Sequence, residues 1–188
     1  MKYILIVLCL INFSLATDDL AVLEKRAESG DSEAQLNLAE AYGEGKGVRQ
    51  DAVKAFQWSK LSAEQGNAQA QYVLAMLYSE GIGVEQNYAE AFKWCRSSAE
   101  QGNAAGQKFL GEMYGRGLGV RQDYSQAFKW SKLSAEQGDV EDQLLIGHMY
   151  NQGIGVESDS KEAKEWFGKA CDNGNQDGCD EYKKLNLK

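Results

Sequence analysis

The chain has 188 residues, of which 43% are hydrophobic and 26% charged, and its formal net charge is −8 at pH 7. An acidic protein repels phosphate backbones, so this charge argues against nucleic acid as a partner. The hydrophobic content and the regular recurrence of aromatic residues exclude a disordered chain. The composition therefore favours a folded protein with a partner other than nucleic acid.

The first residues have the pattern of a secretory signal peptide. Lys2 precedes an apolar stretch over residues 3–13, and Ser14 and Ala16 place small side chains where a signal peptidase reads them. We expect cleavage after Ala16, which removes residues 1–16 and exports the protein to the periplasm or the exterior. The alternative is an uncleaved membrane anchor, although the stretch is short for a span of about 20 residues. No other apolar run is long enough to cross a membrane, so we expect no stable span after cleavage.

From residue 30 onward the sequence is built of blocks that recur every 36 residues without a gap. The full blocks are residues 30–65, 66–101, 102–137 and 138–173. A fixed period of this length is typical of stacked units, because one unit cannot bury its apolar face alone. We expect an all-helical array in which residues 17–29 form an N-terminal capping helix and residues 174–188 form a C-terminal capping helix.

Each block predicts two helices joined by short turns. Every block opens with Gly followed by Asn or Asp, as at Gly66 and Asn67, which suits a helix end followed by a helix cap. The first helix carries apolar residues at offsets of three and four, such as Leu74, Leu77 and Tyr78, and ends at Gly-x-Gly-Val. The second carries a recurring Ala-Phe-x-Trp, which we assign to the core between blocks rather than to a sugar-binding or cation-binding ladder. Because the Gly-x-Gly turns follow no strand, they indicate connections rather than phosphate-binding loops.

Two of the cysteines predict a disulfide. Cys171 and Cys179 lie eight residues apart around the last predicted helix–helix turn, and the same two positions hold Ala and Gln in the earlier blocks. Equivalent positions should therefore face one another across every such turn, and a disulfide here suits an oxidising compartment. A metal-binding or redox pair is the alternative, although His148 is the single histidine and no Cys-x-x-Cys occurs. Cys95 is then unpaired, and we expect no metal site and no cofactor.

The pattern Gly-Asn-Ala-x-Ala-Gln with Gly-x-Gly-Val, followed by Asp-Tyr-x-x-Ala-Phe-x-Trp and Ser-Ala-Glu-Gln, resembles the Sel1-like repeat, a relative of the tetratricopeptide repeat. The Cys-x7-Cys element is similar to that of secreted cysteine-rich Sel1-repeat proteins of Helicobacter type, which carry it in most repeats, whereas this chain carries it once. The resemblance implies a right-handed α-solenoid superhelix of antiparallel helix pairs with first helices along a concave face. It also implies an adaptor that binds proteins or peptides, often at the bacterial envelope.

Positions of the first helices that differ from block to block are the candidates for binding, because they are free of packing duty. They fall at offsets of three or four along one stripe, away from the recurring Leu and Tyr positions, and the tetratricopeptide analogy places this stripe in the groove. We expect a protein or peptide with basic and apolar groups to contact Gln69, Tyr72, Met76, Glu80, Lys108, Glu112, Arg116, Leu144 and His148. Exposure of Tyr72, Met76 and Leu144, together with Leu36 in the same stripe, would argue against a merely solvated face.

Catalysis is the second hypothesis, because some cysteine-rich relatives have been described as penicillin-binding proteins or weak β-lactamases. The sequence has one Ser-x-x-Lys, from Ser158 to Lys161, but it lies at the predicted start of a second helix, and the other two motifs of a serine acyl-enzyme are absent. His148 has no identifiable residue to orient it. We therefore predict a non-catalytic scaffold with no catalytic residues.

Overall fold

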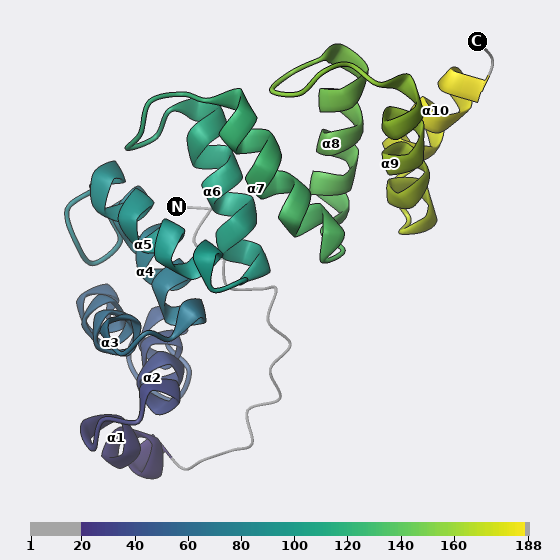
Figure 1. Ribbon diagram of the computed structural model, residues 1–188. Coiled ribbons are helices and arrows are strands. Elements are labelled where there is room, and N and C mark those ends of the chain that lie inside the picture. The colour runs from purple at the N-terminus through teal and green to yellow at the C-terminus, as the bar shows by residue number, and fades with distance from the viewer. Residues whose placement is uncertain (1–19, 187–188) are drawn as a thin grey trace. The chain divides into compact units, whose positions relative to one another are not determined.

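The computed structural model describes residues 20–186, and these residues form ten helices joined by turns (Figure 1). The all-helical fold class predicted from the sequence is confirmed. The predicted signal peptide, residues 1–16, lies outside the described residues, as does the start of the segment 17–29. Within residues 20–186, none of the helices combines the length and the hydropathy needed to cross a membrane.

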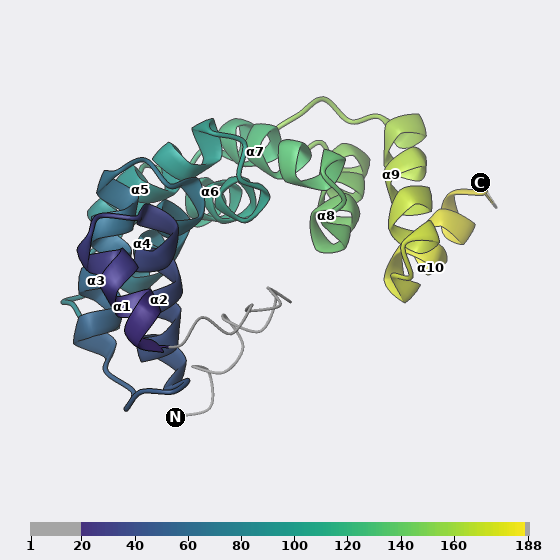
Figure 2. The ribbon, with the colours of Figure 1, turned by 90° about the horizontal axis from the view of Figure 1, so that it is seen from below.

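The described helices belong to two compact units, which divide after residue 87. The first unit contains α1 (Leu20–Glu28), α2 (Ser32–Glu44), α3 (Ala52–Glu64) and α4 (Ala68–Glu80). The second contains α5 (Tyr88–Glu100), α6 (Ala104–Arg116), α7 (Tyr124–Glu136), α8 (Val140–Gln152), α9 (Ser160–Asp172) and α10 (Gln176–Asn186). Within each unit every helix packs against the helix that follows it, as α8, α9 and α10 show in Figure 2.

The helices begin and end at the residue types that the sequence predicts. The side chain of Asn67 caps α4 by accepting a hydrogen bond of 2.9 Å from the N–H of Ala70. At the other end, Gly81 adopts the left-handed conformation with φ 71°, and its N–H donates to the carbonyl oxygen of Leu77. Other helices are capped in the same way by Asp31, Asp51, Asn103, Asp123, Asp139 and Asp159. These contacts satisfy backbone groups that a helix leaves unpaired at its ends.

The second glycine of the Gly-x-Gly turn makes a contact between repeats. At Gly83 φ is 70°, and an added Cβ would lie 2.0 Å from the backbone oxygen of Ala52, at the start of α3. Gly119 and Gly155 lie equally close to the backbone of the preceding repeat. Gly47 has a similar φ of 72°, but no atom of the described residues 20–186 lies within 4 Å of its Cβ position. The turn therefore connects two helices and also packs directly against the backbone of the preceding repeat.

Aromatic pairs join the second helix of one repeat to the first helix of the next. Phe56 on α3 packs edge-to-face against Tyr78 on α4, with ring centroids 5.3 Å apart and an interplanar angle of 89°. The second unit repeats this arrangement at 5.3 Å and 5.1 Å in the pairs Phe92–Tyr114 and Phe128–Tyr150. Each such pair contributes about 0.5–1.5 kcal/mol beyond its buried area. In the last repeat Lys164 replaces the phenylalanine, and its Nζ lies 5.6 Å from the ring centroid of Tyr182.

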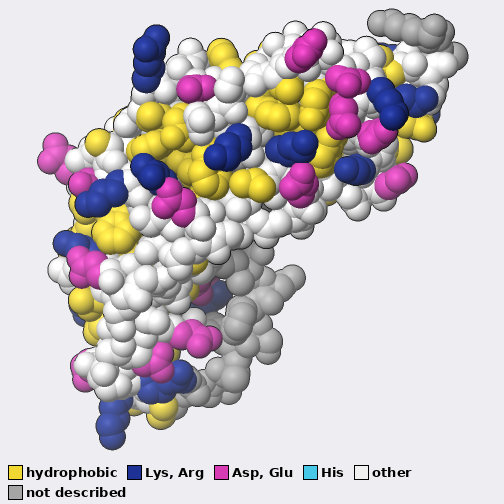
Figure 3. All heavy atoms as spheres, in the orientation of Figure 1, with side chains coloured by type: hydrophobic (Ala, Val, Ile, Leu, Met, Phe, Trp, Pro, Cys, Tyr) yellow, Lys and Arg dark blue, Asp and Glu magenta, His cyan; other side chains and the backbone are white. Residues whose placement is uncertain are grey.

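The tryptophans of the second helices are covered partly by core residues and partly by lysine side chains. Trp58 packs on the core of the first unit. In the second unit the Nζ of Lys93 lies 5.7 Å from the ring centroid of Trp94, and that of Lys129 lies 5.5 Å from Trp130. Hydrophobic and basic side chains are accordingly neighbours on the face of the second unit seen in Figure 3. Cation–π contacts of this kind contribute about 0.5–1 kcal/mol each at exposed sites, so the lysines stabilise these partly exposed rings.

The two facing positions predicted at each helix–helix junction are joined by a glutamine side chain. The Nε2 of Gln35 donates to the carbonyl oxygen of Ala27 at 3.0 Å. The pairs Gln71–Ala63, Gln107–Ala99 and Gln143–Ala135 repeat this bond at 3.2, 3.3 and 3.2 Å. Between α9 and α10 the same positions hold Cys171 and Cys179, which form a disulfide with Cα atoms 4.5 Å apart. A covalent bond thus takes the place of the hydrogen bond at this junction.

We expect the disulfide to stabilise the packing of α10 on α9. Loop-closure entropy for a separation of eight residues predicts that Cys171→Ala with Cys179→Ala lowers the free energy of unfolding by about 2.5 kcal/mol. Guanidinium denaturation without reductant measures this loss. The matched variant, Cys171→Ala with Cys179→Gln, restores the pair used at the other junctions and should regain about 1 kcal/mol through its hydrogen bond. Equal stability of the oxidised protein and the double-alanine variant would refute the prediction.

Candidate functional site

The nine residues predicted to bind a peptide are divided between the two units. Gln69, Tyr72, Met76 and Glu80 lie on α4 in the first unit. In the second unit, Lys108, Glu112 and Arg116 lie on α6, and Leu144 and His148 lie on α8. All of the second-unit residues except Leu144 line one open pocket, so the candidate site is built there.

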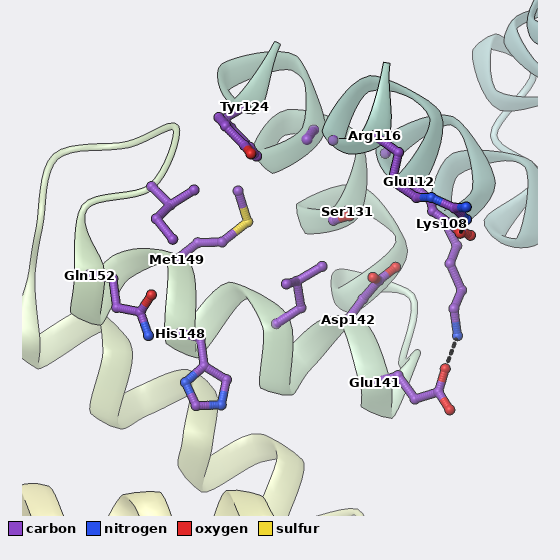
Figure 4. A pocket seen from close by; sticks show the side chains of 15 residues that line it. Lys108, Glu112, Arg116, Tyr124, Ser131, Glu141, Asp142, His148, Met149 and Gln152 are labelled. Atoms are coloured by element: carbon purple, nitrogen blue, oxygen red, sulfur yellow. Dashed lines mark hydrogen bonds and ion pairs between the residues drawn. The ribbon is translucent and has the colours of Figure 1, made fainter. Parts of the chain in front are cut away.

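The pocket lies between α6, α7 and α8 and has a volume of about 470 Å³ (Figure 4). On the side of α6 and α7 it is lined by small residues, Gly111, Gly115, Ala127 and Ser131. Apolar surface comes from Tyr124, Leu145, Met149 and Ile154. Polar groups come from Lys108, Glu112, Arg116, Glu141, Asp142, His148 and Gln152. The arrangement suits a ligand with an apolar body and a small number of polar groups.

Small residues create this pocket where the next repeat holds an aromatic ring. Gly111 and Ser131 correspond to Gly147 and Phe167, each 36 residues further along. A Cβ at Gly147 would lie 2.5 Å from Cδ1 of Phe167, so that fully buried ring lies directly against the α8 backbone. A Cβ at Gly111 would instead lie 2.5 Å from the hydroxyl of Ser131. Because a hydroxymethyl group replaces a benzyl group, the space between α6, α7 and α8 stays open.

The basic residues of the pocket are engaged by neighbouring acids. The Nζ of Lys108 lies 3.0 Å from Oδ2 of Asp139 and 2.6 Å from Oε2 of Glu141, which links α6 to the start of α8. Partial burial opposes the charge on Lys108, but these hydrogen bonds outweigh burial and raise its pKa. Arg116 forms an ion pair with Glu112 one helical turn away. Both cations are thus held by carboxylates at the protein surface.

Asp142 places a buried carboxyl group in the pocket wall, on the side of α8 that faces α7 (Figure 4). Only 3% of the residue is exposed, and burial raises its pKa to about 6, although the nearby hydroxyls of Ser134 and Ser131 and the charge of Lys108 act in the opposite direction. Across the described residues, neither Oδ2 of Asp142 nor Oγ of Ser134 has a partner in hydrogen-bonding geometry. The equivalent positions in other blocks are Ala34, Ala70, Gly106 and Gly178. Comparing the blocks could therefore have singled out Asp142, because it is the charged member of a series of small residues.

The structure corrects the predicted exposure of one leucine and refines that of another. Leu144 is partly buried against the core of the second unit, whereas its neighbour Leu145 is 44% exposed and lines the pocket. Successive residues of a helix point about 100° apart, so a shift of one position turns a side chain from the core toward the pocket. Leu36, on α2 of the first unit, is also buried. Variation between blocks identified the helix face but did not separate adjacent leucines.

The residues considered for catalysis lie in ordinary structural surroundings. Ser158 directly precedes the α9 cap, where the Asp159 carboxylate accepts a 2.9 Å hydrogen bond from the N–H of Lys161. Cys95 is fully buried, its thiol donates to a backbone carbonyl of α6 at 3.3 Å, and burial raises its pKa. His148 lines the pocket. Over residues 20–186 no group of three or more His, Cys, Asp or Glu side chains is placed to hold a metal ion.

Four segments of the chain, residues 32–67, 68–103, 104–139 and 140–175, each match the Sel1 repeat. The structure is similar to that of a protective antigen of uropathogenic Escherichia coli with an SLR fold, with a TM-score of 0.82, 38% identity and coverage of 85% of this chain and 34% of that one. It is equally similar to a Sel1 repeat protein from Oxalobacter formigenes, with a TM-score of 0.82, 36% identity and coverage of 88% and 48%.

Cysteine-rich protein B of Helicobacter pylori is a more distant likeness, with a TM-score of 0.54, 27% identity and coverage of 72% of this chain and 97% of that one. The chain therefore spans a third to a half of the two most similar structures named above and nearly all of this third one. No curated protein matches the chain in sequence. The shared feature of the three structures is the repeat architecture described above.

Proposed function

The chain belongs to the Sel1 repeat family, and we propose that it is an exported, non-catalytic scaffold that binds a segment of a partner protein in the pocket between α6, α7 and α8. The observation that carries this proposal is the open, largely apolar pocket lined by Gly111 and Ser131, at positions where the next repeat holds Gly147 and the buried Phe167 ring. A side chain from a partner protein would fill this pocket.

Export is supported by two independent features. The N-terminal sequence has the pattern of a signal peptide, and the disulfide between Cys171 and Cys179 suits an oxidising compartment. Gln69, Tyr72, Met76 and Glu80 on α4 stay predicted binding residues of the first unit. Tyr72 and Met76 are half-buried, which leaves part of each apolar side chain available for binding.

The test is a variant in which a larger side chain of the protein itself, Ser131→Phe, occupies the pocket. Peptides selected from a random library on the immobilised protein should bind the Ser131→Phe variant at least about tenfold more weakly, a loss of about 1.4 kcal/mol. The variant should fold, because Gly111 offers the same bare backbone to a ring that Gly147 offers to Phe167. Lys129→Ala, which alters the same helix away from the pocket, is the control and should keep full affinity.

Isothermal titration calorimetry of each selected peptide measures these affinities. The proposal fails if no peptide is enriched, or if the selected peptides bind Ser131→Phe as tightly as the unaltered protein.

A further inference from the structure

We propose that the pocket between α6, α7 and α8 is a specificity pocket for a basic side chain of the partner, arginine or lysine, whose cationic group is bound by Asp142. This inference rests on the proposed function and names the chemistry of the residue that the pocket accepts. Three features of the pocket carry it: its apolar lining, a buried carboxyl group whose Oδ2 lacks a hydrogen-bond partner among the described residues, and the ion pairs already formed by its own cations.

The apolar lining suits the stem of a basic side chain. Leu145 and Met149 of α8 line the pocket together with the small residues of α6 and α7. Lysine and arginine carry three or four methylene groups that pack against apolar surface while the charged group reaches a polar partner. The pocket volume of about 470 Å³ has room for such a stem.

The carboxyl group of Asp142 is the feature that selects a cation. It lies in the pocket wall, 3% exposed, and within the described range its Oδ2 has no hydrogen-bond partner. An ionised carboxylate buried without a partner is costly, and a guanidinium or ammonium group removes this cost through charge-assisted hydrogen bonds. A phenylalanine or leucine side chain in the same space would leave the carboxyl group unpaired.

The charges around the pocket also favour a basic ligand. Lys108 is held by Asp139 and Glu141, and Arg116 is held by Glu112, so the protein's basic groups at the pocket are already matched by other acids. Asp142 is the additional negative charge, in a chain whose formal net charge is −8 at pH 7. An acidic ligand would have to compete with the existing carboxylates for Lys108 or Arg116. A basic ligand disturbs neither ion pair.

The experiment uses blocked pentapeptides, acetyl-Ala-Ala-X-Ala-Ala-amide, in which X is arginine, lysine, citrulline, phenylalanine or glutamate. Binding is followed by the amide resonances of Gly111 and Gly115 in ¹⁵N-labelled protein, which report directly on the pocket. The arginine or lysine peptide should shift both resonances and bind at least about tenfold more tightly than the citrulline peptide, which keeps the shape of arginine without its charge. The same loss is expected when Asp142→Asn protein is titrated with the arginine or lysine peptide.

Glu136→Gln is the matched control, because it removes one exposed negative charge at the end of α7 outside the pocket. It should change the affinity for the basic peptides less than about twofold, as expected for a screened surface charge. Equal binding of the arginine and citrulline peptides, or undiminished binding by Asp142→Asn, would overturn the inference. If the phenylalanine peptide binds and the basic peptides do not, the pocket still binds peptides and the assignment of a basic residue is wrong. Failure of every peptide to shift the two glycines would also overturn it.

Discussion

Gly83→Ala is expected to destabilise the protein far more than Gly47→Ala, although both glycines are the second glycine of a Gly-x-Gly turn. Both have φ near 70°, where an L-residue costs about 1–2 kcal/mol, so this term is common to the two variants. At Gly83 the new Cβ would also lie 2.0 Å from the backbone oxygen of Ala52, whereas among residues 20–186 nothing lies within 4 Å of the Cβ position at Gly47. We expect losses of at least about 4 kcal/mol for Gly83→Ala and about 1 kcal/mol for Gly47→Ala in the free energy of unfolding.

Urea denaturation of the two variants, followed by far-UV circular dichroism, measures the difference. The second unit offers a replicate in Gly119, whose Cβ position lies 2.0 Å from the backbone oxygen of Tyr88. Gly119→Ala should therefore behave like Gly83→Ala. A result in which Gly47→Ala and Gly83→Ala are equally destabilised would mean that the turn does not seat one repeat on the preceding one.

Local features of the fold could be predicted because each block carries the residues that form them. Asn67 and Gly81 limit α4 through bonds to their own neighbours, so sequence alone identifies them. The inter-repeat role of Gly83 could not be predicted in this way. Gly47 has the same motif and nearly the same φ but no such contact with any residue from 20 to 186, so the difference depends on what lies opposite the turn in space.

The candidate site was also predicted only in part, because some of its features depend on contacts between helices. Comparison of the blocks selected Lys108, Glu112, Arg116 and His148, which all line the pocket, because variation marks positions that packing does not dictate. It missed Asp142, which lies in the first turn of α8, where a carboxylate is ordinarily explained by the helix dipole. Its burial becomes visible only when α7 is placed beside α8.

Asp142→Asn is expected to stabilise the protein near neutral pH, although it removes the charge that we assign to binding. The pKa of this carboxyl group is raised from 3.8 to about 6 by burial, so the folded state binds its proton more tightly than the unfolded state does. The stability from this group is fully present below pH 3.8 and is lost as the pH rises through about 6. At pH 7.5 the loss amounts to about 3 kcal/mol, which Asn avoids because it does not ionise.

The free energy of unfolding of both proteins, measured by urea denaturation from pH 4 to pH 7.5, tests this expectation. Asp142→Asn should be more stable by up to about 3 kcal/mol at pH 7.5, with an advantage that shrinks through pH 6 and vanishes near pH 4. Asp139 and Lys108 act on the pKa of this carboxyl group, and the pocket also holds the charged or titratable residues Glu112, Arg116, Glu141 and His148. All of them are present in both proteins, so the difference isolates Asp142. Glu136→Gln, which removes an exposed carboxylate, should show no comparable dependence on pH.

An advantage that stays constant over this range would mean that the Asp142 carboxyl group is not buried in the folded protein. The stability measurement also distinguishes a structural role from a binding role. Replacing a residue whose role is purely structural should lower the free energy of unfolding of the protein. A variant that folds more stably and yet binds the arginine or lysine peptide at least tenfold more weakly would separate the two roles. Asp142 would then be a residue that the fold tolerates at a cost in stability because the ligand needs its charge.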